Sequence, residues 1–181
     1  YNFGAGGSSV FNFANPNSAN AYGVEFEIRK KLDFSEAFKN FTLQANGSYI
    51  SSRVKDGNLA LDRPLQGQSP YLINSSLSYY NAENAFGATI LYNVIGRRIR
   101  EAGFLGYENV WEAPRNMLDL QVSKTFINKF ELKATISDIL NQSRDYYQDM
   151  DKNKVYNAEK DRLIERTNFG TTYSFALSYK F

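Results

Sequence analysis

Apolar and polar residues alternate along seven stretches of the chain, and this alternation constrains the fold more than any other feature of the sequence. Successive side chains of a β-strand point to opposite faces, so a period of two predicts strands with one apolar and one polar face. In residues 173–181, Tyr, Phe and Leu occupy every second position, and Ser, Ala and Lys stand between them. No stretch predicts a helix. The predicted strands cover residues 22–32, 41–53, 71–80, 85–95, 118–126, 130–137 and 173–181.

The connections between these stretches alternate between short and long. Long loops are uncommon in compact soluble domains and are usually functional. Strict alternation predicts hairpins with tight turns at one end and large loops at the other, which is how outer-membrane barrels are built. The short connections are residues 33–40, 81–84 and 127–129, and the long ones are residues 54–70, 96–115 and 141–167.

Strand length and the placement of aromatic residues favour a membrane-spanning wall. A strand of about eleven residues, tilted by about 40°, spans roughly 28 Å, which matches an apolar band about 25 Å tall. Tyr and Phe stand toward the ends of the apolar faces, as in the aromatic girdles of such barrels. The sequence therefore predicts an all-β fold, an antiparallel transmembrane β-barrel. A soluble β-sandwich or barrel would also alternate and is the alternative.

Composition excludes several classes of function. The chain has no Cys and no His, and its formal net charge is +2. It therefore lacks the Ser-His and Cys-His pairs of many hydrolases and the usual zinc ligands. Its balanced charge is unlike that of a polybasic nucleic-acid-binding domain. We expect neither an enzyme nor a bound cofactor, metal ion or nucleic acid.

One acidic stretch has the spacing that opens a calcium loop, "DMDKN" at residues 149–153. Such a loop needs a Gly at its sixth position and a Glu at its twelfth. Lys154 and Lys160 stand at those positions instead. The sequence therefore favours a solvated loop over a calcium site.

Three stretches carry most of a resemblance to a known family: "NPNSANAYGVEFEIRKKL" at residues 15–32, "RPLQGQSPYLINSSLSY" at 63–79 and "YSFALSYKF" at 173–181. Shorter likenesses occur in "LYNVIGRRI" and "ISDILNQ". Together they resemble the C-terminal end of a TonB-dependent outer-membrane receptor of the Bacteroidetes type.

The resemblance implies a barrel of about 22 strands with a plugged lumen. Residues 1–181 would then be the C-terminal segment of the barrel domain, about seven strands, without the plug and the N-terminal strands. Bacterial single-chain barrels have an even number of strands, eight or more. A complete eight-stranded barrel, with residues 1–13 as its first strand, is the alternative. The Gly-rich residues 4–9 make a poor strand interior.

The resemblance also implies a function: TonB-energised uptake of a nutrient such as a siderophore, glycan or peptide. The long loops would be extracellular and the C-terminus periplasmic. The implied partners are outer-membrane lipid, the barrel-assembly machinery, a surface lipoprotein, and the TonB complex through a region N-terminal to this chain. The alternatives are a structural barrel or component of an outer-membrane assembly without transport, and an outer-membrane enzyme.

The last strand is a candidate assembly signal. An unpaired edge strand can pair with an assembly factor by strand addition. In the family that the chain resembles, the tail is read by the barrel-assembly machinery. An ordinary lipid-facing edge strand is the alternative. The residues concerned are Tyr173, Phe175, Leu177, Tyr179 and Phe181.

The long loops hold the candidate ligand residues. Arg97, Arg98 and Arg100 form a basic cluster that could hold an anionic ligand or simply be solvated. Aromatic loop residues could line a ligand site or pack the loops together; they are Phe104, Tyr107, Trp111, Tyr146, Tyr147 and Tyr156. The candidates for ligand binding are Arg97, Arg98, Trp111, Tyr146 and Tyr147. Glu25 and Glu27 share the polar face of one strand with Arg29 and Lys31, so we expect ion pairing and not a catalytic dyad.

Overall fold

The computed structural model describes residues 2–3, 9–10, 16–56, 61–103, 107–127 and 129–179. Every regular element among them is a β-strand, and every strand pair is antiparallel. These residues include no helix, and therefore none long and apolar enough to cross a membrane. The prediction of an all-β, antiparallel fold is confirmed.

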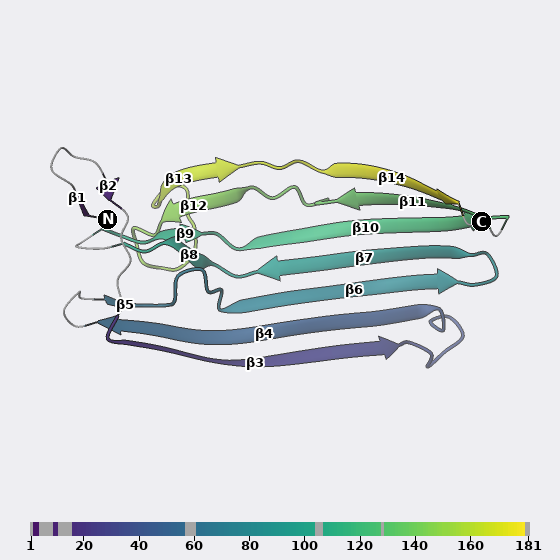
Figure 1. The fold of residues 1–181 in the computed structure, drawn as a ribbon, viewed down its shortest axis with the longest axis horizontal. Coiled ribbons are helices and arrows are strands. Elements are labelled where there is room, and N and C mark those ends of the chain that lie inside the picture. The colour runs from purple at the N-terminus through teal and green to yellow at the C-terminus, as the bar shows by residue number, and fades with distance from the viewer. Residues whose placement is uncertain are drawn as a thin grey trace.

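Seven strands form what we call the main sheet, in the order β14-β11-β10-β7-β6-β4-β3 (Figure 1). They correspond to the seven alternating stretches of the sequence. A short strand, β5 (Leu61–Arg63), pairs with β4. The main strands are β3 (Ser18–Lys31), β4 (Phe41–Asp56), β6 (Tyr71–Asn81), β7 (Phe86–Ile95), β10 (Arg115–Phe126), β11 (Phe130–Ser137) and β14 (Thr172–Tyr179).

The turns and the long connections lie at opposite ends of the main sheet (Figure 1). The turns β3–β4, β6–β7 and β10–β11 gather at one end, where β14 also ends. In the β6–β7 turn, the Asn81 side chain accepts the N–H of Asn84 at 3.0 Å, and Ala85 adopts a φ of 44°. An Asn side chain that satisfies the backbone in this way favours a tight turn. The predicted alternation of connections is confirmed.

The long connections, which the sequence predicts as loops, contain short β-strands. Four strands in them form a second sheet, the loop sheet, in the order β13-β12-β9-β8. Two of its pairings, β8–β9 and β12–β13, join neighbours in the chain, and β9–β12 joins two different connections. The strands are β8 (Arg98–Glu101), β9 (Val110–Glu112), β12 (Arg144–Gln148) and β13 (Arg162–Thr167).

The N-terminal strands stand apart from both sheets. β1 (Asn2–Phe3) and β2 (Ser9–Val10) pair with each other. The rest of the first strand proposed for an eight-stranded barrel, residues 1–13, lies outside the described residues.

The register of the main sheet places its apolar residues on one face. One row of cross-strand partners runs through six strands: Leu43, Leu77, Ile90, Leu120, Ile136 and Tyr173. Most of this face is open to solvent, and exposure reaches 48% at Ile90 and 76% at Phe175. The opposite face carries mainly Gln, Asn, Ser and Thr, with Leu72, Leu91 and Met117 among them. The sheet therefore has one mainly apolar face and one mainly polar face.

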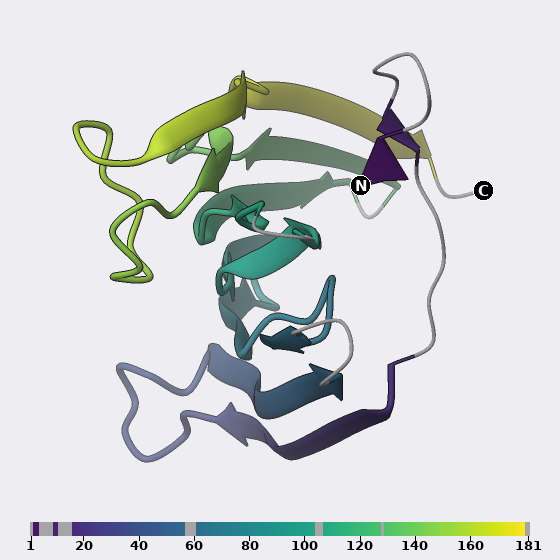
Figure 2. The ribbon, with the colours of Figure 1, turned by 90° about the vertical axis from the view of Figure 1, so that its left-hand side faces the viewer.

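The buried core lies toward the loop end. Seen end-on, the main sheet is a single curved layer from β3 to β14 (Figure 2). Its edge strands β3 and β14 pair with no further strand among the described residues, so the sheet is open. The buried hydrophobic residues are Val54, Val94, Ile99, Val110, Tyr146 and Tyr147.

Candidate functional site

Arg97, Trp111 and Tyr147 meet at the loop sheet. The guanidinium of Arg97 lies over the Trp111 ring, 3.7 Å from its centroid. Its Nη1 donates to the Tyr147 hydroxyl at 3.2 Å and to Asp149 Oδ2 at 2.6 Å. Arg97 and Asp149 have side chains only 13% and 5% exposed. The charge of Arg97 is therefore neutralised inside the protein.

The other two arginines of the cluster are also paired. Arg98 Nε donates to Glu112 at 2.8 Å. Arg100 stacks on the Tyr146 ring at 3.8 Å and donates to Glu165 at 2.9 Å. An anionic ligand at this cluster would have to compete with these carboxylates.

The aromatic loop residues mostly pack against each other and the arginines. Tyr146 and Tyr147 are buried, and the Tyr147 ring lies 5.0 Å from that of Tyr156. Tyr107 is exposed. Phe104 lies outside the described residues. The structure therefore brings the five ligand candidates together, with an arrangement that stabilises the loop sheet.

The carboxyl groups of Asp145 and Asp149 have lowered pKa values. Arg166 donates two hydrogen bonds of 2.7 Å to Asp145, and this pairing lowers the pKa of Asp145 against the opposing effect of burial. Burial favours the neutral form of Asp149, but hydrogen bonds from Arg97 and the Lys154 N–H hold its pKa below the usual value. Burial raises the pKa of the Tyr147 hydroxyl. Both carboxylates are therefore charged at neutral pH.

The carboxylate partners of the arginines were not found from the sequence. Asp145 and Arg166 are cross-strand neighbours of β12 and β13, and Arg115 pairs with Asp138 beside the Phe169 ring. The two strands read "RDYYQ" and "RLIERT", and neither alternates between apolar and polar residues. The sequence therefore carries no period-two signal from which their register could be predicted.

The polar face of the main sheet carries an asparagine ladder. Asn74 Nδ2 donates to Asn46 Oδ1 at 2.8 Å, and Asn93 Nδ2 donates to Asn74 Oδ1. Beside it, Thr89 donates to Ser78 at 3.1 Å. A shallow hollow of about 350 Å³ lies over this ladder and has Gln44 and Asp119 in its lining. Polar side chains therefore bond across the strands on the face where the sequence predicts a lumen.

β14 presents the candidate assembly residues on one exposed face. Tyr173, Phe175, Leu177 and Tyr179 are all exposed, and their strand is an edge of the main sheet. Phe181 lies outside the described residues. Glu25 and Glu27 lie on the exposed strand β3, at the other edge.

Comparisons with protein-family models, with curated proteins and with solved structures find no match for this chain.

Proposed function

We propose that the chain is a C-terminal segment of the wall of an outer-membrane β-barrel. The observation that carries this proposal is the apolar face of the main sheet, which has exposed residues in each of its seven strands. Burying such a face gains about 25 cal/mol per Å². A hydrocarbon layer would cover the whole face at once.

The ends of this face support the same proposal. Aromatic rings line up at the turn end: Phe41 lies 5.0 Å from Tyr79, and Tyr79 lies 6.3 Å from Phe86. Further along, the rings of Phe130 and Tyr179 are 4.9 Å apart. Aromatic rings are enriched where a barrel wall meets the two membrane interfaces. On this proposal, the aromatic rings at the turn end form the girdle at one membrane interface.

The two open edges favour a larger barrel. A sheet spanning a membrane must close, because unpaired backbone groups are costly in hydrocarbon. β3 and β14 would each pair with a strand from the rest of the barrel. We therefore propose a TonB-dependent receptor that takes up a siderophore, glycan or peptide, with the polar face toward a plug. A structural barrel without transport shares every one of these features and is the second candidate.

Lipid exposure can be tested with single cysteines, since this chain has none. Leu132→Cys and Lys133→Cys place a label on opposite faces of β11. In full-length protein reconstituted with brominated lipid, a fluorophore at position 132 should be strongly quenched, and one at 133 should not. Equal quenching at both positions would contradict the membrane wall.

Transport is tested separately from the wall. Full-length protein in detergent should bind the purified periplasmic domain of TonB, and removal of the N-terminal residues of the full-length protein should abolish the binding. If the fluorophore at position 132 is quenched by lipid but TonB does not bind, the result supports a structural barrel without transport.

A further inference from the structure

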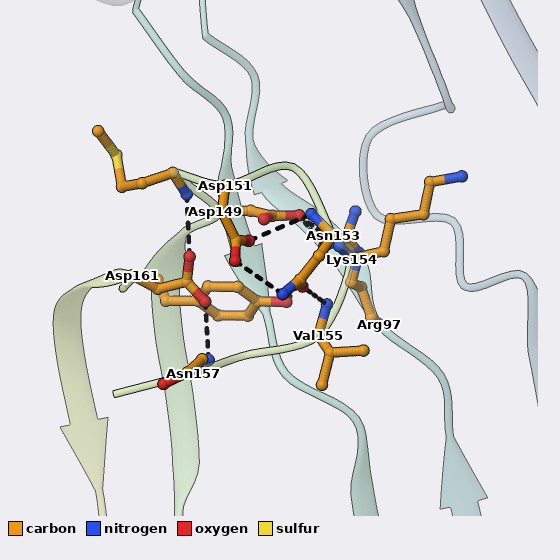
Figure 3. A network of polar contacts seen from close by, with 10 residues as sticks. Arg97, Asp149, Asp151, Asn153, Lys154, Val155, Asn157 and Asp161 are labelled. Atoms are coloured by element: carbon orange, nitrogen blue, oxygen red, sulfur yellow. Dashed lines mark hydrogen bonds and ion pairs between the residues drawn. The ribbon is translucent and has the colours of Figure 1, made fainter. Parts of the chain in front are cut away.

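The connection between β12 and β13 brings three carboxylates together. Asp149 directly follows β12, Asp151 lies two residues later, and Asp161 directly precedes β13. One carboxylate oxygen from each lies within 4.8 Å of the other two. Figure 3 shows the three groups pointing toward one another. The hairpin therefore builds a single oxygen-lined position from both of its arms.

One oxygen of these three carboxylates lacks a hydrogen-bond partner in the part of the chain that the structure describes. Asp149 is buried, and its Oδ2 accepts hydrogen bonds from Arg97 and from the N–H of Lys154, the latter at 2.9 Å. Its Oδ1 is buried and accepts no hydrogen bond from any described residue. A buried charged oxygen left unsatisfied is costly, so a further group is needed there.

The other two carboxylates are held in place by the backbone. Asp161 accepts the N–H of Met150 at 2.9 Å and that of Asn157 at 2.7 Å. Asp151 accepts the N–H of Asn153 at 3.2 Å and its amide at 2.9 Å. Each carboxylate oxygen can accept more than one bond, so these contacts leave lone pairs for a ligand.

The charge of the position is not balanced by the protein. Arg97 lies 2.6 Å from Asp149, and Lys160 lies 3.6 Å from Asp151. Three carboxylates beside two cations leave one negative charge. A missing partner for a carboxylate oxygen in a negative position points to a cation and not to an anion.

The donor set selects among cations. All three side chains offer oxygen, and the chain has no Cys or His to attract zinc. Ca²⁺ binds oxygens at about 2.3–2.6 Å, so two of its ligands can lie up to about 5 Å apart. Mg²⁺ requires about 2.0–2.1 Å and near-ideal octahedral geometry, which fits a wide hairpin less well.

The sequence lacks the Gly and the Glu of a usual calcium loop, and the structure shows what stands in their place. Lys154, at the position of the usual Gly, adopts a φ of 72°, so the sharp turn is made without Gly. Asp161 stands one position after the usual Glu and reaches the same cluster. We propose that Asp149, Asp151 and Asp161 bind one Ca²⁺ that joins the two arms of the β12–β13 hairpin.

The test is a titration of the full-length protein in detergent, after treatment with a chelator. Calorimetry with CaCl₂ should show a single Ca²⁺ site in the unaltered protein, with a Kd of about 10⁻⁵ to 10⁻³ M. The Asp151→Asn variant should bind Ca²⁺ more weakly at this site. Tb³⁺ should bind the same site and emit when tyrosine is excited, since Tyr147 and Tyr156 lie in this hairpin region. Ca²⁺ should displace the Tb³⁺ signal.

Asp151→Asn is the informative variant, because Asp151 is exposed and an Asn there keeps an oxygen for the Asn153 N–H. It should weaken Ca²⁺ binding at least about tenfold, since the charge count of the ligands sets affinity. Glu159→Gln removes one exposed charge from the same connection, outside the cluster, and should leave the affinity unchanged. The proposal is overturned if the folded protein shows no saturable binding up to about 10 mM CaCl₂, ten times the weakest Kd expected. Equal effects of the two variants, or tighter binding of Mg²⁺ than of Ca²⁺, would also overturn it.

Discussion

Arg97 is enclosed by partners from separate parts of the loop sheet. Trp111 comes from β9, Tyr147 from β12, and Asp149 from the connection that follows. Because the guanidinium is planar, it can stack on a ring and donate sideways at the same time. The residue therefore ties three segments together through one side chain.

Arg97→Ala should destabilise the loop sheet strongly. It would leave the buried Asp149 without its cation, and breaking a buried pair in this way costs about 3–5 kcal/mol. Lys152→Ala is the control, because Lys152 is 75% exposed and its pair with Glu108 is long, at 3.3 Å. An exposed pair of that kind contributes about 0–1 kcal/mol. Hydrogen exchange of the β9 and β12 amides measures the loss of stability in each variant. Similar losses of protection in Arg97→Ala and Lys152→Ala would contradict the central role of Arg97.

Leu77→Arg should cost far more than Ser76→Arg. The two residues are neighbours near the middle of β6, and their side chains lie on opposite faces of the main sheet. On the proposed barrel, Arg at the lipid face costs about 2–4 kcal/mol near the bilayer midplane, and a lumen position tolerates it. Denaturant titration of protein refolded into lipid vesicles gives both values. Equal costs at the two positions would contradict the assignment of the faces.

At the scale of elements, the loop sheet and the main sheet are stabilised in different ways. The loop sheet holds most of the buried hydrophobic residues and several of the least exposed ion pairs, such as Arg97–Asp149 and Arg98–Glu112. The main sheet relies on its backbone ladder and on cross-strand polar contacts, such as those of Asn74. Acid should therefore affect the loop sheet first.

The stability of the loop sheet should fall at low pH. Asp145 and Asp149 have folded-state pKa values below the usual value, which is about 3.9 for Asp. Their contribution is therefore complete above about pH 4 and is lost as the pH falls from there toward the folded-state pKa. The single Trp of the chain, Trp111, lies in β9 and reports the change by its fluorescence. We expect a constant signal from pH 7 to about pH 4 and a transition below it.

Asp145→Asn provides the control for this titration. The variant removes the Asp145 carboxyl and should reduce the acid-dependent part of the transition, while lowering the free energy of unfolding already at neutral pH. A transition centred near pH 6 in the unaltered protein would show that other groups govern the acid response.

For the whole molecule, the exposed face and the open edges determine solution behaviour. All fourteen residues of β3 are exposed, and its outer edge has no partner strand among the described residues. Long, exposed apolar edges pair with other chains. Residues 1–181 alone in buffer should therefore aggregate, and detergent should suppress the aggregation. Sedimentation velocity measures this, and a soluble monomer with a sharp, cooperative melt would contradict the proposed barrel wall.

The sequence predicted the main sheet well and the loop end poorly, for a physical reason. Long strands repeat the period of two often enough for the pattern to stand out, as in β4 with 16 residues. β9 has three residues, and its partner β12 lies in another connection. Arg97 looked available to a ligand because Asp149, which neutralises it, lies 52 residues away in the chain. Pairings of that kind depend on tertiary structure and leave no local signal.

The separation of the two sheets has an evolutionary consequence. The loop sheet has its own strand pairings, mostly its own core and its own ion pairs, and within the described ranges none of its strands pairs with a main strand (Figure 1). A mutation in β8, β9, β12 or β13 can alter the surface of the loop sheet without disturbing the register of the main sheet. Selection can therefore diversify what the loops meet while the scaffold stays constant.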